Sequence, residues 1–532
     1  MIGVLQKISR QEIRKMKRVV SMLVCVMLCC FAFAGCNDAK AAKNTETNCV
    51  VSTYNGGYGM DAFKKVAAKF NEHYAEQGLT VTFDDGDPNL TNSSTVSQLQ
   101  AGPKVTTTDL FLPGNVNFRY IVDQGSKFIA GYDCGLEDLT DILDMNVYGE
   151  NVKYRDKVNP QFLDNCAIEK SDSIGYYTLP YMAGMSGFAY DAKLFEDNGW
   201  SVPKTTDELI ALCDKMRNAK ITPFVWASGA GYWDYPVYTW WRQMVTDEQY
   251  EDFWNGINSK GEQDISFINN AAQLRAFTIV EKLLGNTDNS HKYCMRYEHI
   301  EAQIALYTKS NKVAMMPTGD WLETEMKNVG MQSSDIGLFK YPMASDVRER
   351  KNLTTIENNA KLSDVISAID ENKNYTETKT ATGIANLSES DYNEVKKMRS
   401  YMFSNGFMFT AMIPSYANAK DVAKKFILYM ASDEAQQIFY NETHALLPYS
   451  ATNLNTPSSP TRLQQYVIDN MNNATYISNQ MPKNALFYRN GLTSWAENIE
   501  GHMGTTSSDK KNALAFQQYT YDYFAERLAG KI

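Results

Sequence analysis

The stretch CVVSTYNGGYGMDAFKKVAAKFNEHYAEQGLTVTF, residues 49–83, decides the fold class of this chain. Residues 49–53 are an apolar run typical of a short strand, and apolar residues then recur at helical spacing over 61–77. Residues 79–83 alternate apolar and polar side chains, which predicts a second strand. A helix between two strands joins parallel neighbours, because a parallel pair needs a long crossover. The stretch therefore predicts an α/β fold built on a parallel sheet.

Loops at the carboxyl ends of the predicted strands are the expected place for a ligand. The loop 54–60 follows the first strand, and a further strand at 109–112 ends in the similar loop 113–117. Both loops are therefore candidates for one binding edge.

A second body with the same kind of pattern begins near residue 179. Its predicted strand at 221–226 leads into the loop 227–233, and its strand at 312–317 turns into a helix that begins near 320–321. These two loops add to the candidate binding edge.

Aromatic and polar side chains alternate in these loops. A sugar ring lays its apolar C–H face on an aromatic ring, while its hydroxyls need side chains that donate and accept hydrogen bonds in fixed directions. A single aromatic residue packs in a core just as commonly, so the prediction depends on the shared location of the group. The candidate ligand-binding residues are Tyr54, Tyr58, Asn115, Asn117, Trp226, Ser228, Tyr232, Trp233, Asp320 and Trp321.

The amino-terminal segment 14–36, RKMKRVVSMLVCVMLCCFAFAGC, has basic residues before an apolar run and is typical of an export signal. It resembles the signal of bacterial lipoproteins, although Phe33 stands where that family usually has leucine. The resemblance implies removal of residues 1–35, acylation of Cys36 (palmitate) and a flexible tether over 36–48. The mature chain would then be lipid-anchored on the extracytoplasmic face of the cell membrane. An ordinary secretory peptide is the alternative.

The composition excludes several kinds of partner. A formal net charge of −10 repels phosphate backbones, so no nucleic acid partner is expected. The five histidines form no HExxH or similar cluster, so no metal site is expected. The five cysteines after Cys36 are widely spaced and odd in number, which indicates mainly buried thiols rather than a disulfide framework.

A dinucleotide-binding fingerprint is a competing interpretation of the first loop. Gly57 and Gly59, followed by Ala62, lie between a strand and a helix, and Asp84 comes after the next strand. The export signal argues against it, since nicotinamide and flavin dinucleotides are scarce outside the cell. The glycines equally serve close approach of the backbone to any ligand. No cofactor is therefore expected.

Several motifs together give the chain a resemblance to family 1 extracellular solute-binding proteins, the carbohydrate receptors of bacterial ABC importers. The resemblance covers most of residues 49–450. The motifs are LPYMAGMSGFAYD (179–191), FEDNGWSVPKTTDEL (195–209), GLEDLTD (135–141), VAMMPTGDW (313–321), and residues 423–439 with Pro448.

The resemblance implies a two-lobed, periplasmic-binding-protein-like (type II) α/β fold with a hinged interlobe cleft. Its expected lobes are 49–183 with 343–443, including an insertion at 344–400, and 184–342 with 444–532. The chain is expected to cross between lobes near 183–187, 337–343 and 444–448. By motif, Trp321 stacks on the sugar, and the loop 226–233 supplies another aromatic contact.

The implied function is capture of a carbohydrate, an oligosaccharide, by a monomer that delivers it to the transmembrane subunits of an ABC permease. A separate ATPase powers uptake, so no enzyme activity is expected of this chain. Two alternatives stay open. An extracellular carbohydrate-active enzyme would have a similar aromatic cleft but needs a pair of catalytic carboxylates. A receptor for a membrane sensor kinase would bind the same ligand but report it rather than deliver it.

Overall fold

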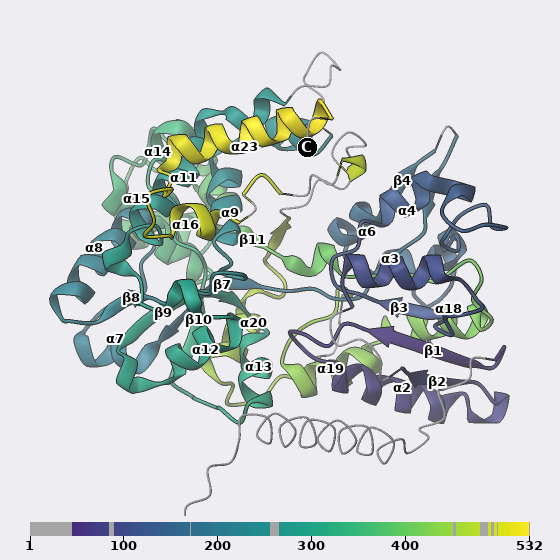
Figure 1. Cartoon of the computed structure of the whole chain (residues 1–532). Helices are drawn as coiled ribbons and strands as arrows, with labels where there is room; N and C mark the ends of the chain where they lie inside the picture. The colour runs from purple at the N-terminus through teal and green to yellow at the C-terminus, as the bar shows by residue number, and fades with distance from the viewer. Residues whose placement is uncertain are drawn as a thin grey trace, which may run out of the picture. The chain divides into compact units, whose positions relative to one another are not determined.

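Two β-sheets, each with its own group of helices, organise the chain (Figure 1). The computed structural model describes residues 45–84, 90–170, 172–255, 265–450, 454–478, 488–490, 494–496 and 498–530. The leader and Cys36 lie outside these ranges. Within them, no helix is long and apolar enough to cross a membrane.

The first sheet is fully parallel. It consists of β2 (Thr80–Phe83), β1 (Asn48–Thr53) and β3 (Leu110–Leu112), in this order. Val51 of β1 lies opposite Phe83 on one side and Leu110 on the other. The crossover from β1 to β2 is α2 (Asp61–His73), which buries its apolar stripe against the sheet. The predicted β-α-β unit is therefore confirmed.

We call the elements packed around this sheet lobe 1. They are α3 (Asn92–Ala101), α4 (Phe118–Gln124), α5 (Tyr154–Lys157), α6 (Pro160–Cys166), β4 (Ala167–Glu169), β5 (Ile174–Tyr176), β6 (Leu179–Pro180), β12 (Thr410–Ala411), α18 (Lys420–Met430) and α19 (Asp433–Thr443).

The second sheet is mixed. It consists of β10 (Ile336–Phe339), β7 (Ser186–Asp191), β9 (Val313–Gly319) and β8 (Thr222–Phe224), in this order. Strand β7 is antiparallel to both of its neighbours, whereas β8 is parallel to β9. The carboxyl ends of β8 and β9 therefore lie at the same edge, and the loops that follow them come together.

We call the elements around this second sheet lobe 2. They are α7 (Ala192–Asn198), α8 (Thr206–Asn218), α9 (Asp234–Met244), α10 (Asp247–Asn255), α11 (Ala271–Leu283), α12 (His299–Tyr307), α13 (Leu322–Asn328), β11 (Tyr401–Phe403), α20 (Arg462–Asn470), β13 (Thr475–Ile477), α22 (Ile499–Met503) and α23 (Ala513–Leu528). The carboxyl-terminal helix α23, yellow in Figure 1, lies against α11.

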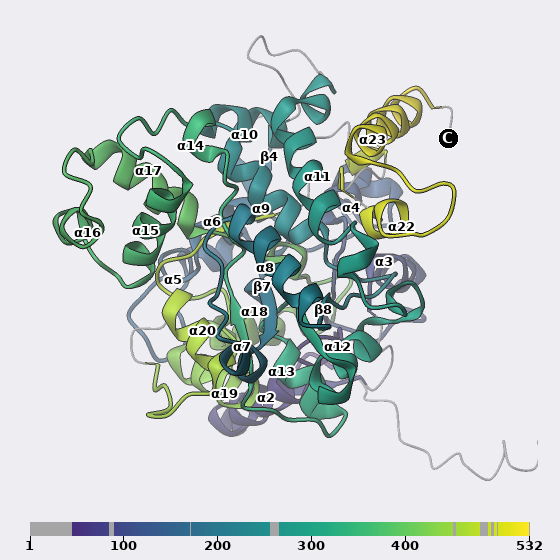
Figure 2. The same cartoon turned by 90° about the vertical axis from the view of Figure 1, so that its left-hand side faces the viewer.

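The insertion 344–400 packs on lobe 2, so its assignment to lobe 1 is wrong. The Ala344 N–H donates to Oε1 of Gln243 in α9 at 3.0 Å, and Nε of Arg275 in α11 lies 2.8 Å from Asp346. The reason is that β10 completes the lobe 2 sheet instead of leaving it. The insertion forms α14 (Val347–Arg350), α15 (Asn359–Asp370), α16 (Tyr375–Thr382) and α17 (Glu389–Ser400), and the last three lie together in Figure 2.

The three crossings between lobes follow from this correction. Strands β6 and β12 pair with each other in lobe 1, whereas β7 and β11 pack in lobe 2. The first crossing is therefore 181–185, close to the predicted place, and the second is 404–409 rather than 337–343. The third also comes later than predicted, because the Ser450 N–H still donates to the Lys157 carbonyl in lobe 1 at 2.7 Å.

The five described cysteines form no disulfide with one another. Cys49, Cys166, Cys213 and Cys294 are buried, whereas Cys134 is half-buried. Burial raises the pKa of the Cys294 thiol to about 12, so this group behaves as a small apolar side chain.

Candidate ligand-binding site

A cavity of about 230 Å³ lies between the lobes, where the loops after β1, β3, β8 and β9 meet. Five of the predicted ligand-binding residues line it: Tyr54, Tyr58, Asn115, Tyr232 and Trp321. The other lining residues are Gly56, Gly57, Thr91, Gly114, Met182, Ala230, Tyr235, Glu325, Asn405, Met408 and Phe409. Both lobes and two of the crossing segments thus contribute to one site.

Aromatic rings from both lobes line this cavity. On the lobe 2 side, the ring centroids of Tyr232 and Trp321 are 5.6 Å apart with an interplanar angle of 68°. On the other side, the Tyr54 and Phe409 centroids are 5.7 Å apart. The first pair packs edge-to-face and the second is tilted at 51°, and these contacts fix the orientation of the rings. Trp321 is 3% exposed, so it lines the cavity with only a small part of its surface.

Two glycines make room for these rings. A Cβ at Gly319 would overlap the Trp321 indole, and one at Gly56 would overlap the Tyr54 ring. Glycine is therefore required where each side chain folds back against its own loop. The sequences Gly319-Asp-Trp and Tyr54-Asn-Gly encode these ring positions locally.

Two polar contacts connect lobe 1 to lobe 2 beside the cavity. The Tyr58 hydroxyl donates to Oδ1 of Asp320, and the Gly57 N–H donates to Oε1 of Glu325 at 3.1 Å. Nε2 of Gln303 donates to the second Glu325 oxygen at 2.6 Å. The loop after β1 is thus held by two carboxylates of lobe 2.

Burial changes the titration of both carboxylates. Asp320 is 5% exposed, and burial raises its pKa to about 7, against the opposing effect of hydrogen bonds from Tyr58 and the Met185 N–H. Burial also raises the pKa of Glu325, opposed by its hydrogen bond from Gln303. Loss of solvation therefore dominates at both positions.

The remaining predicted residues lie around this cavity without lining it. Asp320 is buried beneath Tyr58. Trp226 and Trp233 pack edge-to-face with centroids 4.7 Å apart, and each is at most 1% exposed. Nε1 of Trp226 donates to Oγ of Ser290 at 2.9 Å. The two tryptophans therefore pack in the core beneath the loop 227–233 and do not line the cavity.

The side chain of Asn117 and the backbone of Ser228 form hydrogen bonds within the protein. Oδ1 of Asn117 accepts from the Tyr120 N–H at 3.2 Å and caps α4, while its Nδ2 donates to the Tyr488 carbonyl at 2.9 Å. The Ser228 N–H donates to the Tyr297 carbonyl at 3.1 Å. Ligand contact by the predicted residues, whether or not they line the cavity, stays a prediction.

The sequence reasoning missed several cavity-lining residues. Asn405, Met408 and Phe409 come from the second crossing, which was expected near 337–343. Their run YMFSNGFMF (401–409) is rich in aromatic residues, a signal that could have drawn attention to it. Tyr235 lies two residues beyond the predicted loop, in the first turn of α9.

Solved structures establish the fold class. The GacH receptor of Streptomyces glaucescens, solved without ligand and with acarbose, aligns with a TM-score of 0.56 at 14% identity, covering 91% of this chain and 98% of that one. The bacterial solute receptor AcbH, described as preferring β-D-galactopyranose, aligns with a TM-score of 0.55 at 15% identity over 91% of this chain and 100% of that one. The chain therefore has the two-lobed type II fold of solute receptors.

The chain belongs to the bacterial extracellular solute-binding protein family, whose model matches residues 65–461. The multiple sugar-binding protein of Streptococcus mutans is 23% identical over 334 residues, 62% of this chain and 70% of that protein. The diacetylchitobiose binding protein NgcE of Streptomyces coelicolor is 23% identical over 198 residues, 36% of this chain and 38% of that protein. The resemblance given by the motifs is thus confirmed.

Proposed function

We propose that this chain is an extracellular carbohydrate receptor, which captures an oligosaccharide between its lobes and delivers it to the transmembrane subunits of an ABC permease. The observation that carries the proposal is the cavity itself, with aromatic rings on both sides and polar groups between them. Closure of two lobes over the sugar supplies the ligand-dependent state that a permease recognises.

An unused hydrogen-bonding group supports a polar ligand. Oδ1 of Asn405 is buried at the cavity and has no hydrogen-bond partner among the described residues. A buried acceptor left without a donor costs free energy. A sugar hydroxyl supplies that donor, while the rings of Trp321 and Tyr54 accommodate the apolar ring face.

The carboxylates of the site favour a receptor over a carbohydrate-active enzyme. Glycoside hydrolysis needs two carboxyl groups that reach the scissile bond from the site. Among the described residues that line the cavity, Glu325 is the one with a carboxylate. Asp320 lies nearby but is buried and hydrogen-bonded to Tyr58, so it does not line the cavity. The named relatives are likewise binding proteins.

A thermal-shift screen tests the proposal. Neutral oligosaccharides should raise the melting temperature, since a ligand at 100 times its Kd stabilises the folded state by about 2.7 kcal/mol. Uronic acid oligomers of matched length should have less effect, because the lining includes Glu325 and no lysine or arginine among the described residues. Failure of every sugar to stabilise the chain, or cleavage of sugars at enzymic rates, would overturn the receptor assignment.

We propose further that the receptor is a monomer held at the membrane by lipid on Cys36. Cys36→Ala should move the protein from the membrane to the soluble fraction, because an acyl chain supplies most of the attachment. Fractionation and immunoblotting measure this. Cys134→Ala is the matched control and should stay membrane-bound. A Cys36→Ala protein that remains with the membrane would contradict the anchor.

A further inference from the structure

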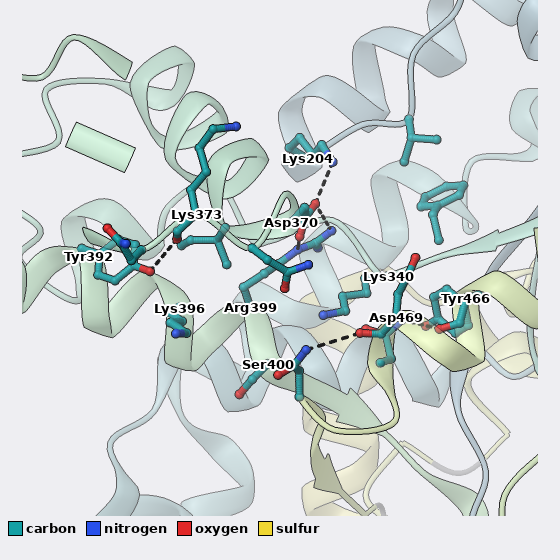
Figure 3. Close-up of a pocket in the computed structure, with 17 residues that line it drawn as sticks. Lys204, Lys340, Asp370, Lys373, Tyr392, Lys396, Arg399, Ser400, Tyr466 and Asp469 are labelled. Carbon is teal, nitrogen blue, oxygen red and sulfur yellow. Dashed lines mark hydrogen bonds and ion pairs between the residues drawn. The ribbon is translucent and has the colours of Figure 1, made fainter. Parts of the chain in front are cut away.

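We propose that lobe 2 carries a second ligand site, for a small organic anion, in a pocket formed where the insertion helices α15 and α17 meet β10 and α20 (Figure 3). The pocket has a volume of about 350 Å³, within the range of small-molecule sites. It shares no lining residue with the interlobe cavity. The inference is therefore independent of the proposed carbohydrate function.

The pocket is rich in positive charge. Its described lining contains five cationic side chains, Lys204, Lys340, Lys373, Lys396 and Arg399, against two carboxylates, Asp370 and Asp469. The whole chain, by contrast, has a formal net charge of −10. A concave region of opposite sign to the rest of the molecule concentrates anions at its mouth.

The charges of Arg399 and Lys204 are partly neutralised by Asp370, which also holds the two side chains in place. Nε and Nη2 of Arg399 contact the two oxygens of Asp370 at 2.8 and 2.9 Å, and Nζ of Lys204 lies 2.6 Å from the same carboxylate. Both cations hold the pKa of Asp370 well below its usual range, in spite of its burial. The bidentate pair fixes this wall of the pocket, and two positive charges face a single carboxylate.

Another part of the charge has no partner. Neither Lys340 nor Lys396 forms an ion pair or hydrogen bond with any residue in the described part of the chain. Lys340 extends from the end of β10 into the group of side chains labelled in Figure 3, with Asp469 nearby. The Asp469 carboxylate accepts from Nε2 of Gln465 at 2.6 Å, outside the pocket lining.

Burial makes the charged form of Lys340 less favourable than it is in water. Burial, together with the nearby charge of Arg399, lowers the pKa of Lys340 to about 8, although Asp370 and Asp469 act in the opposite direction. An anion beside Lys340 would favour the charged form and accept a hydrogen bond from its ammonium group. The charge of the pocket therefore favours an anionic ligand.

The other walls indicate an organic anion rather than a bare inorganic one. Phe339, Ile369 and Val202 contribute apolar surface, while Asn470 and Asn473 contribute amide groups. The carbon skeleton of an organic anion would pack against the three apolar side chains, while its carboxylate or phosphate group would contact the lysines. A concave pocket of about 350 Å³ suits a small molecule better than a peptide or a lipid surface.

Isothermal titration of the full chain with disodium succinate and with glycerol 3-phosphate tests the site. Saturable binding of either compound, above the effect of sodium chloride at equal ionic strength, would support the site. The compound that binds more tightly shows whether the pocket prefers a carboxylate or a phosphate group. Lys340→Gln should weaken that binding at least ten-fold, as expected for loss of a charge-assisted hydrogen bond.

Two further variants keep the test decisive. Lys396→Gln changes an exposed side chain, so it folds even if Lys340→Gln does not, and it should also weaken anion binding. Lys215→Gln, on the exposed face of α8, is the matched control and should bind like the unchanged protein. No saturable binding of either anion, or equal binding by both pocket variants and the control, would overturn the site. Carbohydrate binding by Lys340→Gln should be unchanged, which separates this test from that of the cavity.

Discussion

Replacing Trp321 with alanine is expected to weaken carbohydrate binding by about 1–3 kcal/mol, roughly 5- to 150-fold in Kd, without unfolding the protein. The indole lines the cavity beside Tyr232, and Gly319 provides the space in which it lies. Its removal deletes a stacking surface while leaving the sheet that carries it intact. Calorimetric titration with the best sugar of the screen measures the change.

Trp200 provides the control for this substitution. It is a half-buried tryptophan of lobe 2 that packs edge-to-face on Phe195, with centroids 5.8 Å apart, and it does not line the cavity. Trp200→Ala should therefore keep the sugar affinity. Equal affinity of Trp321→Ala and the unchanged protein would exclude stacking on Trp321.

Carbohydrate affinity should also fall as the pH rises, by roughly ten- to thirty-fold between pH 5.5 and 8.5. Burial raises the pKa of the Asp320 carboxyl to about 7 from an ordinary value of 3.8, although the hydrogen bond from Tyr58 opposes this shift. Opening of the lobes would separate Tyr58 from Asp320 and expose the Asp320 carboxyl to water. Closure of the lobes is therefore coupled to proton uptake by Asp320. A carboxyl with a raised pKa favours the closed state most at low pH, and this contribution is lost as the pH rises from about 4 to about 7.

Asp320→Asn tests the cause of this pH dependence. The amide keeps the shape of the side chain and accepts from Tyr58 but does not titrate in this range. Its affinity should vary little from pH 5.5 to 8.5, measured by titration at each pH. The same slope in Asp320→Asn and the unchanged protein would show that another group is responsible.

Local patterns in the sequence predicted the parts of the fold that depend on neighbouring residues. The β-α-β unit at 49–83 and the helix after β9 have strong periodicity and clear ends. Helices α15 and α16 were not predicted. Helix α16 buries only Thr378 and Thr382 and so has no apolar stripe, whereas α15 does bury one, at Leu362, Val365, Ile366 and Ala368. Their starts did carry a signal, since Asn358 and Asn374 cap them through the Lys361 and Glu377 N–H groups.

Parts of the site that depend on distant segments could not be predicted. Tyr54 and Trp321 follow strands directly, so the rule that ligands gather at carboxyl ends was enough to select them. Phe409 reaches the cavity because β12 pairs with β6, more than 200 residues earlier in the chain. Trp226 and Trp233 also lie after the carboxyl end of a strand, yet both pack in the core. An aromatic residue at such a position can therefore either line a ligand site or fill the core, and the sequence does not distinguish the two.

The two ends of the insertion 344–400 lie close together. The insertion begins after β10 and ends at β11, both strands of lobe 2, and Nη1 of Arg399 at its end donates to the Tyr341 carbonyl near its start at 3.1 Å. Its two ends are therefore neighbours, as in domains acquired by insertion into an existing gene. A segment whose ends are adjacent can be replaced or shortened without moving the strands on either side of it. None of the described residues that line the interlobe cavity belongs to this segment, so such a change would leave that cavity's lining intact.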